Sequence, residues 1–151
     1  MSNEACPMPS RGQGSDAAAI ERMLSANRIA VVGLSDDPGR PSFQIASYLR
    51  GEGYEIVPVN PTHAAVMGLK SYPTLQDVPG QVDVVNVFRR PAFCADITRD
   101  AIAIGAKGVW LQSGIRDDEA KEIAAAAGID FVQDRCIMIE HRMRCARVVS
   151  E

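Results

Sequence analysis

Short apolar runs alternate with amphipathic segments along most of this chain. The apolar runs have the length and the β-branched character of strands, and they lie at residues 29–32, 55–60, 82–88, 108–112 and 130–132. Segments with apolar residues at helical spacing lie at 17–25, 41–52, 91–104 and 117–127, and a short helical turn is predicted at 74–78. Strands that alternate with helices of about 10 to 12 residues indicate βαβ units and a parallel sheet.

Residues that favour helix ends support these boundaries. Asp16 is the predicted N-cap of the first helix, which we expect to cover an edge of the sheet, and Pro41 and Pro91 suit first helical positions. Gly53 and Gly128 follow predicted helices, where glycine accepts the left-handed conformation of a helix end. The predicted fold class is therefore α/β: a Rossmann-like open parallel sheet of about five strands with helices on both faces.

The composition is that of an ordinary α/β domain. With 151 residues, of which 46% are hydrophobic and 23% charged, the chain can bury one core. We therefore predict a single domain at residues 16–151. The polar segment at residues 1–15, rich in glycine, proline and serine, is predicted to be a disordered tail.

Charge and hydropathy exclude several classes of partner. The net charge of −3 gives no general attraction for nucleic acids or anionic membranes, so neither is an expected partner. No apolar stretch approaches the roughly 20 residues of a transmembrane helix, and the first residues lack the apolar core of a signal peptide. The sequence thus predicts a cytoplasmic protein.

The four cysteines and two histidines do not form a metal motif. Cys6, Cys94, Cys136 and Cys145 are scattered without a C-x-x-C pair, so no metal site is predicted and the thiols are expected to be free. Cys136 follows the last predicted strand. Its thiol is either a small buried hydrophobe or a group able to exchange with a disulfide at the edge of the sheet, and the sequence leaves both interpretations open.

The loop at residues 33–40 is the leading candidate for ligand binding. In an open parallel sheet, ligands bind beyond the carboxyl ends of the strands, and the start of the following helix attracts phosphates. The loop begins with Gly33 but lacks the G-x-G-x-x-G pattern of a dinucleotide site, which argues against an ordinary NAD site. Arg40, Arg89 and Arg90 lie in the loops of this edge and suit a phosphorylated ligand, although exposed arginines are often only solvated.

The end of the second strand carries Asn60. NAD-binding proteins usually have a carboxylate near this position, which would repel a phosphorylated ribose. The neutral Asn60 permits coenzyme A (CoA) or NADP instead. Asn60 before Pro61 is equally suited to form a turn, so its role is open between binding and turn formation.

Four segments resemble a known family. VVGLSDDPGRPSFQIASYLRGEGYEIVPVNP, VDVVNVFRRP, WLQSGI and DRCIMIEH resemble the small CoA-binding protein family, which is similar to the CoA-binding domain of the succinyl-CoA synthetase α subunit. The likeness covers nearly all of residues 20–141. It implies a Rossmann-like domain whose cofactor is CoA or an acyl-CoA.

The resemblance also implies ten cofactor-binding positions. These are Gly33, Leu34, Ser35, Arg40, Ser42, Asn60, Pro61, Phe88, Arg89 and Gln112. Residues 33–35 would face the diphosphate and Arg40 would lie beside the phosphates. The Ser42 amide would meet an anion, and Phe88 with Arg89 would border the adenosine. Phe43 departs from the polar or basic residue expected there.

The expected function is non-catalytic binding of CoA or an acyl-CoA. The phosphorylated histidine of the synthetases lies in another domain, and neither His63 nor His141 matches it. Glu140 and His141 are neighbours on a helix and are interpreted as surface or capping groups, and Trp110 as core. We find no nucleophile with a base and an orienting group.

The alternative functions are those of an NAD(P)-dependent oxidoreductase, or of a regulatory or ligase-subunit module with a partner enzyme. A homo-oligomer is also open.

Overall fold

A five-stranded parallel sheet forms the centre of the molecule. The computed structural model describes residues 14–150, with side chains for 16–144, so the predicted tail lies outside the described residues except for Gly14 and Ser15. The strands are β1 (Arg28–Val32), β2 (Glu55–Val59), β5 (Val84–Val87), β6 (Gly108–Leu111) and β7 (Asp130–Val132). Their order is β2-β1-β5-β6-β7, and every neighbouring pair is parallel. The predicted open parallel sheet is confirmed.

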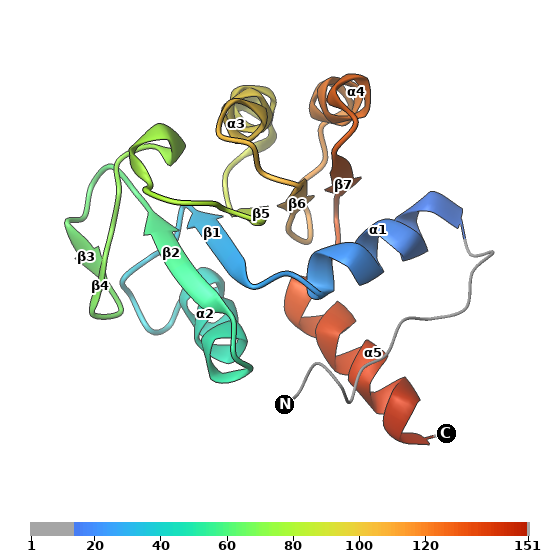
Figure 1. Cartoon of the computed structure of the whole chain (residues 1–151). Helices are drawn as coiled ribbons and strands as arrows, with labels where there is room; N and C mark the ends of the chain where they lie inside the picture. The colour runs from blue at the N-terminus through green and yellow to red at the C-terminus, as the bar shows by residue number, and fades with distance from the viewer. Residues whose placement is uncertain (1–13, 151) are drawn as a thin grey trace.

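Helices cover both faces of this sheet, as predicted (Figure 1). They are α1 (Gly14–Leu24), α2 (Pro41–Gly51), the 3₁₀ helix η2 (Leu75–Asp77), α3 (Pro91–Ala103), α4 (Asp118–Ala127) and α5 (Ile137–Ser150). Helices α1, α2 and α5 pack on one face, and α3 and α4 pack on the other. Since β1, β5, β6 and β7 are each followed directly by a helix, the amino ends of α2, α3, α4 and α5 all lie at the edge where the strands end.

Side chains alternate between two apolar cores, one on each face. Ile29 and Val31 of β1 belong to the core under α1, α2 and α5, whereas Ala30 and Val32 belong to the core under α3 and α4. This alternation explains the near-continuous apolar runs, because a strand covered on both sides buries every residue. Trp110 is fully buried, as predicted, and its Nε1 donates to the Arg135 carbonyl at 2.8 Å.

Three features of the fold were not predicted correctly. Helix α1 begins at Gly14, so Asp16 lies in its first turn, where its charge suits the helix dipole, and is not the N-cap. A hairpin of β3 (Ala65–Val66) and β4 (Leu69–Lys70) is too short to produce a sequence pattern. The bounds of helix α5 were not predicted either, although Glu140 and His141 were placed on a helix. Among the described residues, no helix is both long and apolar enough to span a membrane.

The interpretation of His141 as a surface group was wrong. Its side chain is buried against α2, with Nδ1 at 2.7 Å from the Tyr48 hydroxyl. One turn further along α5, Arg144 makes a buried ion pair with Glu21 of α1. These two contacts attach α5 to the other helices of its face. Glu140 is partly exposed, as expected, and pairs with Arg135.

Candidate functional site

The chain reverses direction at Gly33, directly after β1. Gly33 has φ +87°, a conformation that side chains disfavour, and its amide donates to the Val59 carbonyl of β2 at 2.9 Å. A Cβ at this position would lie 2.7 Å from the Phe88 carbonyl oxygen. A residue with a side chain therefore cannot occupy this turn, which joins the ends of β1, β2 and β5.

Side-chain hydrogen bonds hold the loop between Gly33 and α2. The Ser35 amide donates to the Ser42 hydroxyl at 3.0 Å, and the Asp37 amide donates to the Ser35 hydroxyl at 3.0 Å. Asp37 in turn accepts from the Gly39 amide at 2.9 Å. Arg40 precedes α2 but its side chain makes no capping hydrogen bond. The first amides of α2 thus remain a place for an anion.

Asn60 links the end of β2 to this loop. Its side-chain amide donates to the Leu34 carbonyl at 2.9 Å, and its carbonyl oxygen accepts from the amide and hydroxyl of Thr62 at 2.9 and 2.7 Å. Asn60 therefore forms the turn that its sequence context suggested. The bond to Leu34 also fixes the first residues of the loop at 33–40, directly after β1.

These segments border an open cavity of about 340 Å³ at the carboxyl ends of β1, β2 and β5. It is lined by Gly33, Ser35, Arg40, Pro41, Ser42, Asn60, His63 and Phe88. Six of the ten predicted cofactor-binding residues thus lie around one space. Pro41 and His63 were not among them. His63 could have been included, because it lies three residues after Asn60 in a loop of the same sheet edge.

The other four predicted residues lie outside this lining. Leu34 is fully buried in the core, and Pro61 is exposed. The Arg89 guanidinium stacks on the Phe93 ring, with 4.2 Å between Cζ and the ring centre. Gln112 is buried, and its Oε1 accepts from the Ile137 amide at 3.0 Å, so it supports the start of α5.

The electrostatics of the cavity favour an anion. Arg40 is exposed, and within residues 16–144 no carboxylate lies within ion-pair distance of its guanidinium. Its donors are therefore available to a ligand. The Asp36 carboxylate is occupied on the other side of the loop, where it accepts from the Met67 amide at 3.1 Å and anchors the β3–β4 hairpin.

Cys94 lies in the first turn of α3, and Cys136 directly precedes α5. Burial raises the pKa of Cys94 to about 11, which keeps this thiol protonated at neutral pH. Cys136 is a free, partly buried thiol that packs beside the core of the α1, α2 and α5 face. In the part of the chain described by the structure, no three potential metal ligands lie together.

Comparisons with known proteins agree with the resemblance drawn from the sequence. The family model described as "CoA binding domain" matches residues 27–142. The chain is 36% identical to YneT of Bacillus subtilis over 130 residues, which span 85% of this chain and 96% of YneT. A solved structure of a protein from Pyrococcus horikoshii superposes with a TM-score of 0.81 at 34% identity, covering 89% of this chain and 98% of that chain.

A more distant relative is an enzyme subunit. The α subunit of an ADP-forming acetate–CoA ligase from Pyrococcus furiosus is 28% identical over 131 residues. The match covers 80% of this chain but only 29% of the ligase subunit. The similarity is thus confined to one part of a larger protein.

Proposed function

The chain belongs to the CoA binding domain family, and from this premise we propose that it binds CoA or an acyl-CoA without catalysing a reaction itself. The proposed site is the cavity at the carboxyl ends of β1, β2 and β5. The observation that carries this proposal is the convergence of Gly33, Ser35, Arg40, Ser42, Asn60 and Phe88 on one cavity at the amino end of α2.

Each part of the cavity suits a part of the cofactor. The turn at Gly33 has no side chain and would let the diphosphate approach the backbone, and the first amides of α2 would donate hydrogen bonds to its oxygens. The Arg40 guanidinium would pair with a phosphate, and Phe88 would border the adenosine. A cavity of about 340 Å³ is at the small end of ligand pockets, so the pantetheine arm would extend along the open edge of the sheet.

The predicted residues outside the lining have more limited proposed roles. Pro61 and Arg89 would contact the adenosine from the rim of the cavity. Leu34 would contribute through its backbone, since its side chain is buried. Gln112 would act mainly on the shape of the edge, because it holds the start of α5.

Calorimetric titration of the nucleotide-free protein tests the ligand. CoA should bind saturably, dephospho-CoA should bind more weakly, and NADP should not reproduce the CoA isotherm. We expect this order because dephospho-CoA lacks the 3′-phosphate of CoA, and because NADP presents its phosphates to Arg40 in a different arrangement. Absence of heat with all three ligands would rule out the proposed function. Binding of NADP alone would favour the oxidoreductase alternative.

Substitution of Arg40 tests the location. Arg40→Ala should weaken CoA binding by about 1–3 kcal/mol, the contribution of a charge-assisted hydrogen bond, with little change in stability. Arg99→Ala is the matched control, since Arg99 is an exposed arginine of α3 that pairs with Asp96 and Glu119. Equal effects of the two substitutions on affinity would exclude Arg40 from the site.

A second candidate function is that of a CoA-binding module for a ligase. It is favoured by the similarity to ADP-forming acetate–CoA ligases, of which this chain matches only a part. Acetate, CoA and ATP can be incubated with the purified protein and assayed for acetyl-CoA. We expect none from this chain alone, and formation of acetyl-CoA would contradict non-catalytic binding.

A further inference from the structure

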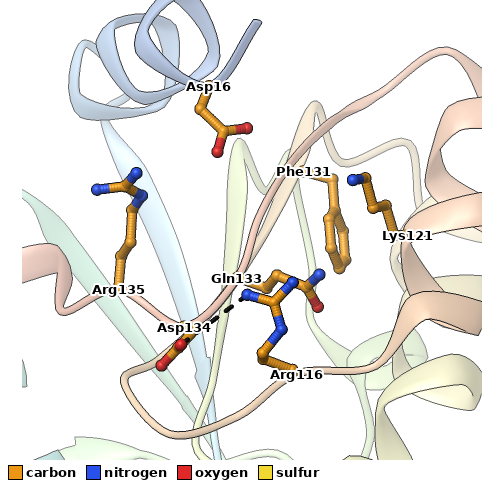
Figure 2. A pocket seen from close by; sticks show the side chains of 7 residues that line it. All are labelled: Asp16, Arg116, Lys121, Phe131, Gln133, Asp134 and Arg135. Atoms are coloured by element: carbon orange, nitrogen blue, oxygen red, sulfur yellow. Dashed lines mark ion pairs between the residues drawn. The ribbon is translucent and has the colours of Figure 1, made fainter.

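A second cavity of about 340 Å³ lies at the far end of the same sheet edge, beyond β6 and β7. It is lined by Asp16, Arg116, Lys121, Phe131, Gln133, Asp134 and Arg135 (Figure 2). The lining comes from the first turn of α1, the loop between β6 and α4, helix α4, and β7 with the loop that follows it. It shares no residue with the cavity of the proposed CoA site.

Hydrogen bonds between the two loops give this cavity fixed walls. The Gln133 side-chain oxygen accepts from the Asp117 amide at 2.8 Å, and Asp134 accepts from the Gly114 amide at 2.7 Å. The Asp134 amide donates to the Ile115 carbonyl at 3.1 Å. Asp134 has φ +59°, and these bonds offset the strain of that conformation. The cavity is therefore formed before any ligand arrives.

The cations of the cavity are only partly neutralised by the protein. Arg135 pairs with Glu140 at 3.2 Å, but the pair of Arg116 with Asp134 is long, at 3.9 Å. For Lys121, no carboxylate within residues 16–144 lies at ion-pair distance. The Arg116 side chain is 60% exposed, so its fork of donors is accessible. Arg116 and Lys121 together suit a phosphate group.

The remaining lining adds two further kinds of contact. The Phe131 ring and the Lys121 side chain lie next to each other on one wall, and the Asp16 carboxylate enters the space from α1 (Figure 2). An aromatic face accommodates a planar ring, and a carboxylate accepts hydrogen bonds from hydroxyl or amino groups. A simple inorganic anion would use neither group.

We infer that this cavity binds a phosphate monoester of the size of a nucleoside monophosphate. Arg116 and Lys121 would hold the phosphate, Phe131 would contact the base, and Asp16 would accept from the sugar hydroxyls. The inference is independent of the proposed CoA site, because the two cavities use different loops. The volume of this second cavity, about 340 Å³, falls within the range of small-molecule pockets.

The test is a titration of the full chain with AMP, followed by amide chemical shifts in NMR. AMP should bind saturably and move the amides of Gly114, Phe131 and Gln133. Arg116→Ala and Lys121→Ala should each weaken binding about tenfold, as expected for the loss of a charge-assisted hydrogen bond. Both side chains are exposed, so these variants should fold normally.

Matched controls separate this site from the CoA cavity and from general charge effects. Lys107→Ala removes an exposed lysine that directly precedes β6, at the amino ends of the strands, and should change AMP affinity less than twofold. Shifts confined to the loop at residues 33–42, or equal weakening by Lys107→Ala, would overturn the inference. Equal affinity for AMP and ribose 5-phosphate would overturn the assignment of the base to Phe131.

Discussion

The two faces of the sheet are built in different ways. Under α3 and α4 the core consists of small apolar side chains, chiefly valine and alanine. Under α1, α2 and α5 the core also contains polar groups: the Glu21–Arg144 ion pair, the Tyr48–His141 hydrogen bond, and the Tyr54 hydroxyl that donates to the Leu24 carbonyl. The first face is held mainly by apolar burial, with the buried Thr98 hydroxyl donating to the Cys94 carbonyl and Arg99 pairing with Glu119 at the surface, whereas the second face also contains a buried ion pair.

This difference follows from how the helices are attached to the chain. Helices α3 and α4 are crossovers with a strand on both sides, so short connections already fix their positions. Helix α5 follows the last strand and α1 precedes the first, so each has only one such connection. Polar contacts of α1 and α5 then help to determine how these two helices pack.

Four measurements test this contrast between the two faces.

The largest effect should come from breaking the buried ion pair. Glu21→Ala removes one carboxylate from beside the buried Arg144 guanidinium and should lower the free energy of unfolding by about 3–5 kcal/mol. Denaturant unfolding measures this change. Arg22→Ala is the control, because its pair with Asp130 is exposed and should contribute at most about 1 kcal/mol. Similar losses in the two variants would contradict a special role for the buried pair.

On the face under α3 and α4, a substitution that shortens a buried side chain should destabilise the fold only through the empty volume that it leaves in the core. Leu111→Ala, at a fully buried position under α3 and α4, should lower the free energy of unfolding by about 2–4 kcal/mol. The loss should be the same at pH 5.5 and pH 7.5, since the variant affects no titrating group. A loss that varies with pH, measured by urea unfolding at both values, would contradict the description of this core as mainly apolar.

A smaller effect, of opposite sign, is expected at Asn86 of β5. Its side chain is fully buried beside Val31 and Trp110 in register, and neither of its polar atoms has a hydrogen-bond partner among the residues that the structure describes. Asn86→Leu keeps the number and branching of the side-chain heavy atoms while removing both unpaired polar atoms, and it should raise the free energy of unfolding by about 1–3 kcal/mol. A decrease, seen as a lower denaturation midpoint, would indicate that the amide has a partner in solution, such as a bound water.

The smallest expected effect is the contribution of His141 to the pH dependence of the free energy of unfolding. Burial lowers the pKa of His141, and the nearby Arg144 lowers it further, while Glu52 opposes the shift. As the pH falls through the ordinary value of about 6.5, the unfolded chain gains a proton that the folded chain resists. Stability from this group is therefore present above pH 6.5 and is lost below it.

Comparison of the wild type with His141→Gln measures this contribution. The wild-type free energy of unfolding should fall more between pH 7.5 and pH 5.5 than that of the variant. Tyr48 and Tyr54, which contact the imidazole, do not titrate in this range, since burial raises the pKa of both and that of Tyr54 to about 12. Equal changes in the two proteins would exclude His141 as the source.

Much of the candidate site could be predicted from the chain because its residues lie in segments that end predicted strands. Gly33, Asn60 and Phe88 each come directly after a strand, and parallel strands end at one edge. Gln112 follows the same rule, yet it is buried under the start of α5. Whether a residue at a strand end faces the cavity depends on the helix that covers it. The sequence analysis placed Glu140 and His141 on a helix but did not predict that this helix begins at Ile137, beside Gln112.

The sequence by itself determined the five strands of the sheet, the helices that alternate with them along the chain, and the parallel arrangement of the sheet. It did so because apolar periodicity, helix-end residues and the geometry of βαβ units are local properties or follow directly from them. Tertiary structure alone decided which charged residues are buried and which loops meet. Glu21 and Arg144 are 123 positions apart, and only the packing of α1 against α5 brings them together.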